Sequence, residues 1–193
     1  MTRSRGAAFV IPEEVTLGLR DRRQERRGGD GMQHFQMRQK LASIGDDYWI
    51  ENDRGERVYK VDGKALRVRQ TLIFEDADGN ELAKIQERMM RVKDSMEIED
   101  ADGHRIAMVK QALVTPLRDR WSVQIEDGPD LEVQGNIVDH EYTFKDGHDE
   151  VATVSKKWFR VADSYGVEVT PGQNPIVVLA ATVVLDMLAH EGR

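Results

Sequence analysis

Two acidic motifs are the first candidates for chemistry in this sequence. Asp76-Ala77-Asp78-Gly79 and Asp100-Ala101-Asp102-Gly103 each bring two carboxylates close to a glycine, and hard cations such as Ca²⁺ prefer clustered carboxylate oxygens. The longer calcium loop, which ends in a bidentate glutamate, is not completed around either motif. Asp and Gly in this order also cap tight β-turns. We therefore expect turns here and no metal site.

Histidines are the other candidates for metal binding or acid–base chemistry. Among the five histidines, Asp139-His140-Glu141 and His148-Asp149-Glu150 each bring one histidine close to two acids. Consecutive side chains on a strand point to opposite faces of the sheet, so these neighbours cannot converge on one metal ion. We expect each histidine to be exposed or satisfied by contacts within the fold.

The sequence shows no recognisable nucleophile. It has no cysteine, which excludes disulfides, thiolate metal sites and cysteine catalysis. No serine lies in a Gly-x-Ser-x-Gly elbow, and no glycine-rich phosphate loop precedes a helix. Carboxylates are abundant, but an acid–base pair needs a concave site to hold it. We expect no catalytic residues and no cofactor, and a protein that is not an enzyme.

The elements that carry these motifs are predicted to be β-hairpins. From Phe35 to Thr170, short segments of alternating apolar and polar residues are separated by Asn, Asp and Gly, a pattern typical of antiparallel strands. Residues 66–79 align with residues 90–103, 24 positions later, and fainter copies occur at 117–128 and 159–169. Each copy has the length of one hairpin.

A hydrophobic helix is predicted at the C-terminus. Asn174 is suited to cap it, Pro175 to begin it, and residues 176–189 are apolar almost all round. A helix without a polar face must be surrounded by lipid or by protein, and this one is too short for a bilayer. Small alanines recur in three strands, at Ala83, Ala107 and Ala152, which indicates something bulky against the sheet.

Together these features predict an all-β fold with one helix. About a dozen strands are too many for a comfortable open sheet, and a barrel of that size needs its interior filled. We therefore expect a closed antiparallel barrel of about 12 strands around the buried helix. The predicted domain spans residues 35–193. Residues 1–34 are predicted to form a disordered, Arg-rich tail, since they lack hydrophobic periodicity.

Charge is unevenly distributed along the chain. The formal net charge is −7, and residues 1–31 hold seven arginines against five acids, so that stretch carries +2 and the remainder −9. An acidic body argues against nucleic-acid binding, which usually needs a basic face. No apolar run is long enough for a signal peptide or a membrane span, so we expect a cytoplasmic protein.

Within the predicted barrel, acids and bases separate. In an up-and-down barrel the hairpin turns lie at one end, here called the tip end, and the connections between hairpins lie at the other, the link end. The turns near residues 52–55, 76–79, 100–103, 127–130 and 146–149 are rich in Asp and Glu. The candidate ligand-binding residues are the bases of the link end: Lys64, Arg67, Arg69, Arg88, Arg91, Lys93, Arg118, Arg120, Lys156, Lys157 and Arg160.

Three stretches of the sequence carry a resemblance to a known family. They are Val58-Tyr59-Lys60-Val61-Asp62-Gly63-Lys64-Ala65-Leu66, Gly135-Asn136-Ile137-Val138-Asp139-His140-Glu141-Tyr142 and residues 154–167, and the resemblance extends over residues 35–190. On these residues the sequence resembles the LURP-one-related family, which has the tubby C-terminal-like fold and is related to phospholipid scramblases. The resemblance implies a barrel threaded by its C-terminal helix. It also implies contact with phospholipid or phosphoinositide head groups.

The functional expectation follows from the basic link end and this resemblance. Bases beside apolar residues such as Met89, Met90, Trp158 and Phe159 are suited to an anionic membrane surface. We expect a non-enzymatic domain that binds anionic phospholipid head groups or another phosphorylated ligand, peripherally at a membrane. The bases are alternatively solvated surface charges paired with nearby acids. The alternative function is a protein-interaction or structural module without a small ligand.

Overall fold

A computed structural model of the chain describes residues 31–38, 48–62, 71–87, 95–115, 118–158 and 164–191. These residues form twelve strands, one short 3₁₀ helix and one α-helix. In chain order the elements are β1 (Gln33–Arg38), β2 (Tyr48–Asn52), β3 (Arg57–Asp62), β4 (Thr71–Asp76), β5 (Glu81–Glu87), β6 (Ser95–Asp100), β7 (Arg105–Thr115), β8 (Arg118–Ile125), β9 (Leu131–Asn136), β10 (Glu141–Asp146), β11 (Asp149–Ser155), η2 (Lys156–Trp158), β12 (Ser164–Val169) and α2 (Pro175–Glu191).

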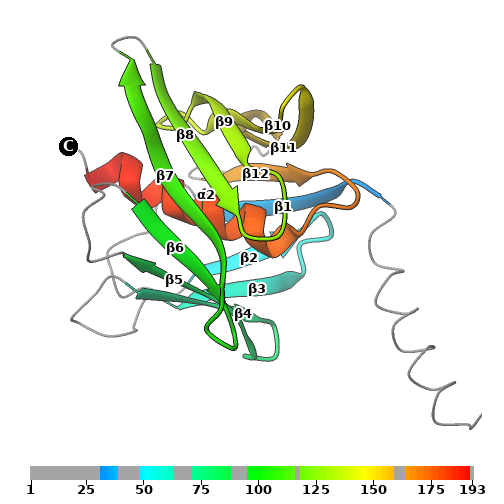
Figure 1. The fold of residues 1–193 in the computed structure, drawn as a ribbon. Helices are drawn as coiled ribbons and strands as arrows, with labels where there is room; N and C mark the ends of the chain where they lie inside the picture. Colours follow the sequence, from blue (N-terminus) through cyan, green and yellow to red (C-terminus); the bar gives the residue numbers. More distant parts are fainter. Residues whose placement is uncertain are drawn as a thin grey trace, which may run out of the picture. The chain divides into compact units, whose positions relative to one another are not determined.

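The strands close into one antiparallel barrel, as predicted (Figure 1). Each strand pairs with its neighbours in sequence, and β1 completes the ring by pairing with both β12 and β2. The β1 strand begins at Gln33, and His34 pairs with Glu168. The barrel therefore includes two residues that the sequence assigned to the tail. The first thirty residues of that tail lie outside the described part of the chain.

The 24-residue repeat corresponds to hairpins that have the same kind of turn and the same irregularity in strand register. The β4–β5 and β6–β7 hairpins each have a register shift just before the turn, after Phe74 and after Ile98. The β2–β3 hairpin has the same shift after Ile50, again 24 positions earlier. All three turns carry a glycine with positive φ at the equivalent position. The repeat thus has a third copy, whose turn matches the others although its strands diverge in sequence.

Alternation along the strands determines which side chains fill the barrel. In β6, Met96 and Ile98 are buried while Glu97 and Glu99 are partly exposed. The three alanines also face inward and are fully buried. Ala83 and Ala107 lie on β5 and β7, which are among the strands nearest α2. Ala152 lies opposite Phe144 on the neighbouring strand, just as Ala83 lies opposite Phe74, so these two small residues also make room for a cross-strand ring.

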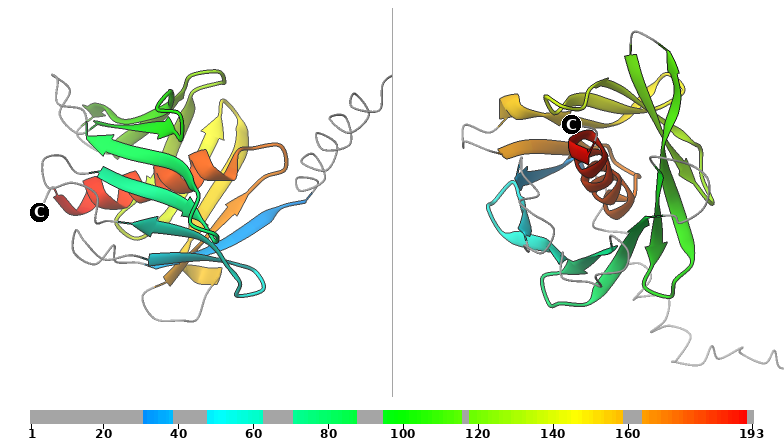
Figure 2. Two further views of the ribbon diagram at one scale, coloured as in Figure 1. Left: turned by 90° about the horizontal axis from the view of Figure 1, so that it is seen from below. Right: turned by 90° about the vertical axis from the view of Figure 1, so that its left-hand side faces the viewer.

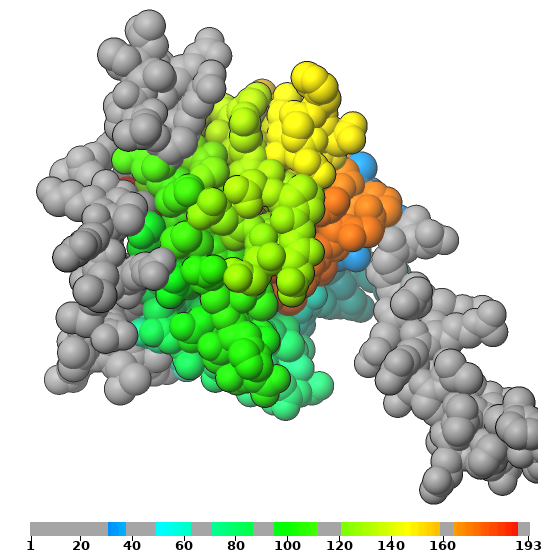
Figure 3. All heavy atoms as spheres, viewed as in Figure 1, coloured from blue at the N-terminus to red at the C-terminus, as the bar shows by residue number. Residues whose placement is uncertain are grey.

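The helix α2 runs through the interior of the barrel (Figure 2). Its first turn is capped by Asn174, whose side-chain oxygen accepts the N–H of Ile176 at 3.0 Å, as the sequence predicted. Every residue from Val177 to Asp186 is buried. In the space-filling view of Figure 3, the strands in front cover the helix behind them. Among the described residues, no helix combines the length and apolar character needed to cross a bilayer.

Strand direction fixes what lies at each end of the barrel. The chain enters α2 from the tip end, after β12, so the C-terminal half of the helix lies toward the link end. The β9–β10 turn and the residues that follow β11 also lie at the link end. The second of these segments holds Lys156 and Lys157, two of the predicted ligand-binding residues.

Candidate functional site

Two of the predicted ligand-binding residues have side chains that the structure describes. Lys156 and Lys157 form η2, directly after β11 at the link end. Arg118 and Arg120 lie in β8, which β9 and β10 separate from β11 in the barrel. The other candidates lie outside the described residues: Lys64, Arg67, Arg69, Arg88, Arg91, Lys93 and Arg160.

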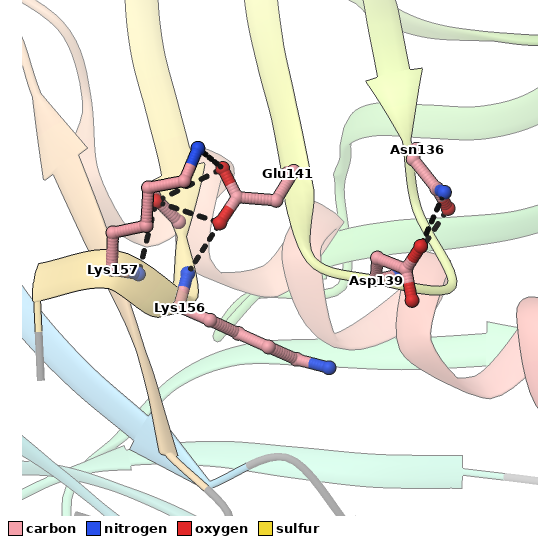
Figure 4. A network of polar contacts seen from close by, with 6 residues as sticks. Asn136, Asp139, Glu141, Lys156 and Lys157 are labelled. Atoms are coloured by element: carbon pink, nitrogen blue, oxygen red, sulfur yellow. Dashed lines mark hydrogen bonds and ion pairs between the residues drawn. The ribbon is translucent and has the colours of Figure 1, made fainter. Parts of the chain in front are cut away.

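Glu141 at the start of β10 organises the η2 turn (Figure 4). Its carboxylate accepts the hydroxyl of Ser155 at 3.0 Å, the backbone N–H of Lys156 at 3.2 Å and the Nζ of Lys157 at 3.2 Å. Desolvation alone would raise the pKa of Glu141, but these hydrogen bonds and the charge of Lys157 outweigh it and lower the pKa. Glu141 is therefore ionised at neutral pH and partly neutralises Lys157.

The Lys156 side chain is arranged differently. In Figure 4 its ammonium group points away from Glu141 and Lys157. Within the described part of the chain, no carboxylate lies within ion-pairing distance of its Nζ. The η2 turn therefore presents one exposed lysine, Lys157, held by a carboxylate, and one half-buried lysine, Lys156, whose ammonium group lies away from that carboxylate.

Large apolar side chains are exposed at the same end. Trp158, the last residue of η2, is 42% exposed, and Val138 in the β9–β10 turn is 41% exposed. The β9–β10 turn is held by Asn136, whose amide donates to Asp139 at 2.6 Å and whose oxygen accepts the Asp139 N–H at 3.1 Å. At the link end, the η2 turn and the β9–β10 turn thus each present an exposed apolar side chain near the lysines of η2. We call Val138, Lys156, Lys157 and Trp158 the link-end surface.

The acidic turns of the tip end are explained by local hydrogen bonding. Asp76 accepts the N–H groups of Asp78 and Asn80 at 2.9 and 2.8 Å, and Asp100 accepts that of His104 at 2.8 Å. The side-chain hydrogen bond from Asn80 lowers the pKa of Asp76, and the backbone hydrogen bond from His104 lowers that of Asp100. These carboxylates act as turn caps, which matches the sequence interpretation of both motifs.

Asp100, Asp102 and His104 do come close enough together to surround a cation. All three are solvent-accessible, and one oxygen of Asp100 is already used by the turn. A cluster of exposed acids is common without any ion, so we assign no metal site here.

A second group of polar residues lies inside the barrel, below the link-end surface. His140, which ends the β9–β10 turn at φ +52°, is fully buried, and its Nε2 lies 2.8 Å from Oδ1 of Asp186 on α2. The hydroxyl of Tyr165 on β12 donates to Oδ2 of the same carboxylate at 2.6 Å. The imidazole and phenol rings stack with centroids 4.2 Å apart. Each of these side chains is occluded from solvent, so no substrate reaches them in this conformation.

Tyr142 on β10 borders this buried group. Its side chain is almost completely buried, and burial raises its pKa well above the ordinary value, with the nearby charge of Asp186 adding to the effect. The phenol therefore remains neutral in the folded protein at pH values where it ionises in the unfolded chain.

This shift predicts a specific loss of stability in alkali. Above pH 10 the unfolded chain loses the Tyr142 proton while the folded protein keeps it, so unfolding becomes more favourable as pH rises. Between pH 10 and pH 11 the loss amounts to about 1 kcal/mol. Urea unfolding of wild type and Tyr142→Phe across pH 8–11 measures this loss. The free energy of unfolding should fall more steeply with pH for wild type than for Tyr142→Phe. Parallel curves would show that Tyr142 ionises equally easily in both states.

Sequence reasoning missed Asp186 and the role of His140. Asp186 lies in a helix that reads as apolar almost all round, and His140 reads as one of several unremarkable histidines. The one available signal was a single acid within the hydrophobic run, since a buried carboxylate requires a partner. Val138 gave no signal, because apolar residues in turns are common.

Comparison with known proteins identifies the fold's relatives. The chain is 26% identical over 154 residues to the uncharacterized protein YxjI of Bacillus subtilis, covering 80% of this chain and 92% of that protein. It also resembles the X-ray structure of a protein from Arabidopsis thaliana, with a TM-score of 0.61 and 16% identity, covering 86% of this chain and 94% of the other; this likeness shows a shared fold. The family model described as LURP-one-related matches residues 33–186, and the chain therefore belongs to the LURP-one-related family.

Proposed function

We propose that this protein is a non-enzymatic binding module that docks on anionic phospholipid head groups through the link-end surface. The observation that carries the proposal is the combination of Lys156 and Lys157 with exposed Trp158 and Val138 on two neighbouring turns. Tryptophan favours the interface between water and lipid, and lysine near an anionic surface contributes about 1 kcal/mol per residue. In this proposal the protein is cytoplasmic and meets the membrane only peripherally.

The charge of the opposite end supports this orientation. The described turns of the tip end carry many carboxylates, among them Asp76, Asp78, Asp100 and Asp102. An anionic membrane repels that end, so the charge distribution favours an approach by the link end. The segments that join β3 to β4 and β5 to β6 also contain Lys64, Arg67, Arg69, Arg88, Arg91 and Lys93. Their part in binding stays a prediction from the sequence.

Vesicle flotation tests the proposal. The double variant Lys156→Glu/Lys157→Glu should bind phosphatidylserine vesicles at low salt at least about tenfold more weakly than wild type, because two favourable charges become repulsive. Trp158→Ala should weaken binding at both low and high salt, since its contribution is apolar. Little of the wild-type protein or of either variant should float with neutral phosphatidylcholine vesicles.

A matched control places the same charge change at the other end of the barrel. Arg54 lies in the β2–β3 turn and Lys145 near the end of β10, both at the tip end. Arg54→Glu/Lys145→Glu should leave vesicle binding close to that of wild type. Equal losses for the two double variants, or equal recovery on neutral and anionic vesicles, would refute the proposal. Salt-sensitive self-association without vesicle binding would favour the protein-interaction alternative.

A further inference from the structure

The buried helix carries one polar stripe. Thr182 and Asp186, four residues apart and therefore on the same face, are the buried polar side chains of α2 among the described residues. The rest of the buried helix is Val, Leu and Ala. Because apolar contacts are non-directional, a helix of this kind in an apolar lumen has little to fix its rotation or depth.

Asp186 meets two separate elements of the barrel wall. Tyr165 reaches it from β12 through the 2.6 Å hydrogen bond, and His140 reaches it from the β9–β10 turn at 2.8 Å. The two partners also stack on each other, so each restricts the position of the other. A carboxylate held from two directions satisfies this geometry at only one rotation and one depth of the helix.

We infer that His140, Tyr165 and Asp186 form a latch that fixes the rotation and depth of α2 in the barrel and ties the β9–β10 turn to the helix. This inference concerns the fold itself and does not depend on any ligand of the link end. We refer to these three residues as the helix latch.

The energetics of buried polar groups support a role in specificity. Replacing buried hydrogen-bonded or charged partners together by apolar residues of similar shape is often neutral for stability, because desolvation offsets their attraction. Such groups are best known for selecting one register among several of similar energy. A helix that is apolar on all its faces has to select one rotation and one depth among several of similar energy.

The connection to the turn comes from the backbone at His140. Its N–H donates to the carbonyl of Ile137 at 3.0 Å, which closes the turn, and its positive φ directs the imidazole into the lumen. Loosening the latch should therefore release this turn and the last turns of α2, while distant turns at the tip end stay unchanged.

Two variants and one control test the inference. Asp186→Leu removes the carboxylate from the latch, and Tyr165→Phe removes one hydroxyl while keeping the ring. Leu185→Ala removes a neighbouring buried side chain without touching the latch. Methyl NMR of Ala180, Ala181, Val183 and Val184 reports how many positions the helix occupies, and amide exchange at His140 reports on the turn.

The inference predicts more than one set of helix methyl signals for Asp186→Leu and a single set for Leu185→Ala, although the latter is also destabilised. It predicts that Tyr165→Phe speeds exchange of the His140 amide by about tenfold or more, with the Asp100 amide in the β6–β7 turn unchanged. A single set of signals for Asp186→Leu with unchanged exchange at His140 would overturn it. Should Asp186→Leu not fold, unchanged exchange in Tyr165→Phe alone would overturn it.

Discussion

Replacing either Ala180 or Ala181 with Glu should leave the chain unable to form the barrel. Both alanines are fully buried although adjacent helical positions point about 100° apart, so the helix has no side on which a carboxylate reaches water. Burying an unpaired charge costs several kcal/mol even after relaxation, and whole domains are stable by only about 5–15 kcal/mol. Soluble yield and circular dichroism measure the outcome for each variant.

A control at the entrance of the helix separates burial from general intolerance of charge. Gln173 lies just before α2, in the turn that leads from β12. Gln173→Glu should fold normally, because an acid near a helix N-terminus is favourable. If Ala180→Glu or Ala181→Glu folded as well as Gln173→Glu, one face of the helix would have to reach solvent.

Substituting Gly135 with Ala should produce the other large effect, a destabilisation of about 3 kcal/mol or more. Gly135 has φ +133°, which side-chain-bearing residues rarely adopt, and an added Cβ would lie 2.4 Å from the carbonyl oxygen of Glu141 and 2.7 Å from the Cα of Tyr142. These are backbone atoms of the paired strand β10, so relief of the contact requires the β9–β10 hairpin to shift. The midpoint of urea unfolding measures the change.

Gly103 provides the comparison, because it isolates backbone strain from steric contact. Its φ is +83°, but an added Cβ would meet no atom within 4 Å. Gly103→Ala should therefore cost only about 1 kcal/mol, the penalty of a left-handed conformation. If the two alanine variants were equally stable, crowding between β9 and β10 would not be what requires glycine at position 135.

The architecture could be predicted from the sequence because its signals are local. Alternation places Met96 and Ile98 inside, Asp and Gly mark the turns, and Asn174 with Pro175 marks the start of α2. The sequence repeat does not reveal the third copy, the β2–β3 hairpin, because its turn begins with Asn52 and its strands differ in sequence. The shared property is a backbone hydrogen-bond pattern. The N–H groups of residues 52, 76 and 100 each donate to the carbonyl oxygen of the residue four positions later.

The interior polar contacts could not be predicted in the same way. His140 and Asp186 are brought together only when the helix has entered the barrel, and neither has a sequence neighbour that reveals the other. The backbone position of Lys156 in the η2 turn depends likewise on Glu141, which is distant in sequence and adjacent across β10 and β11. Most of the predicted bases of the link end lie outside the described residues, so the sequence remains the basis for their role.

The position of α2 after the described strands in the chain has a consequence for biosynthesis. Synthesis proceeds from β1 to β12 and then to α2, so the strand that closes the ring and the helix that fills its centre emerge after the other described strands. Until then the nascent hairpins have no interior to pack against, and a hairpin alone is marginally stable. The barrel can therefore be completed only once α2 has emerged, and until then its unfilled sheets expose apolar surface.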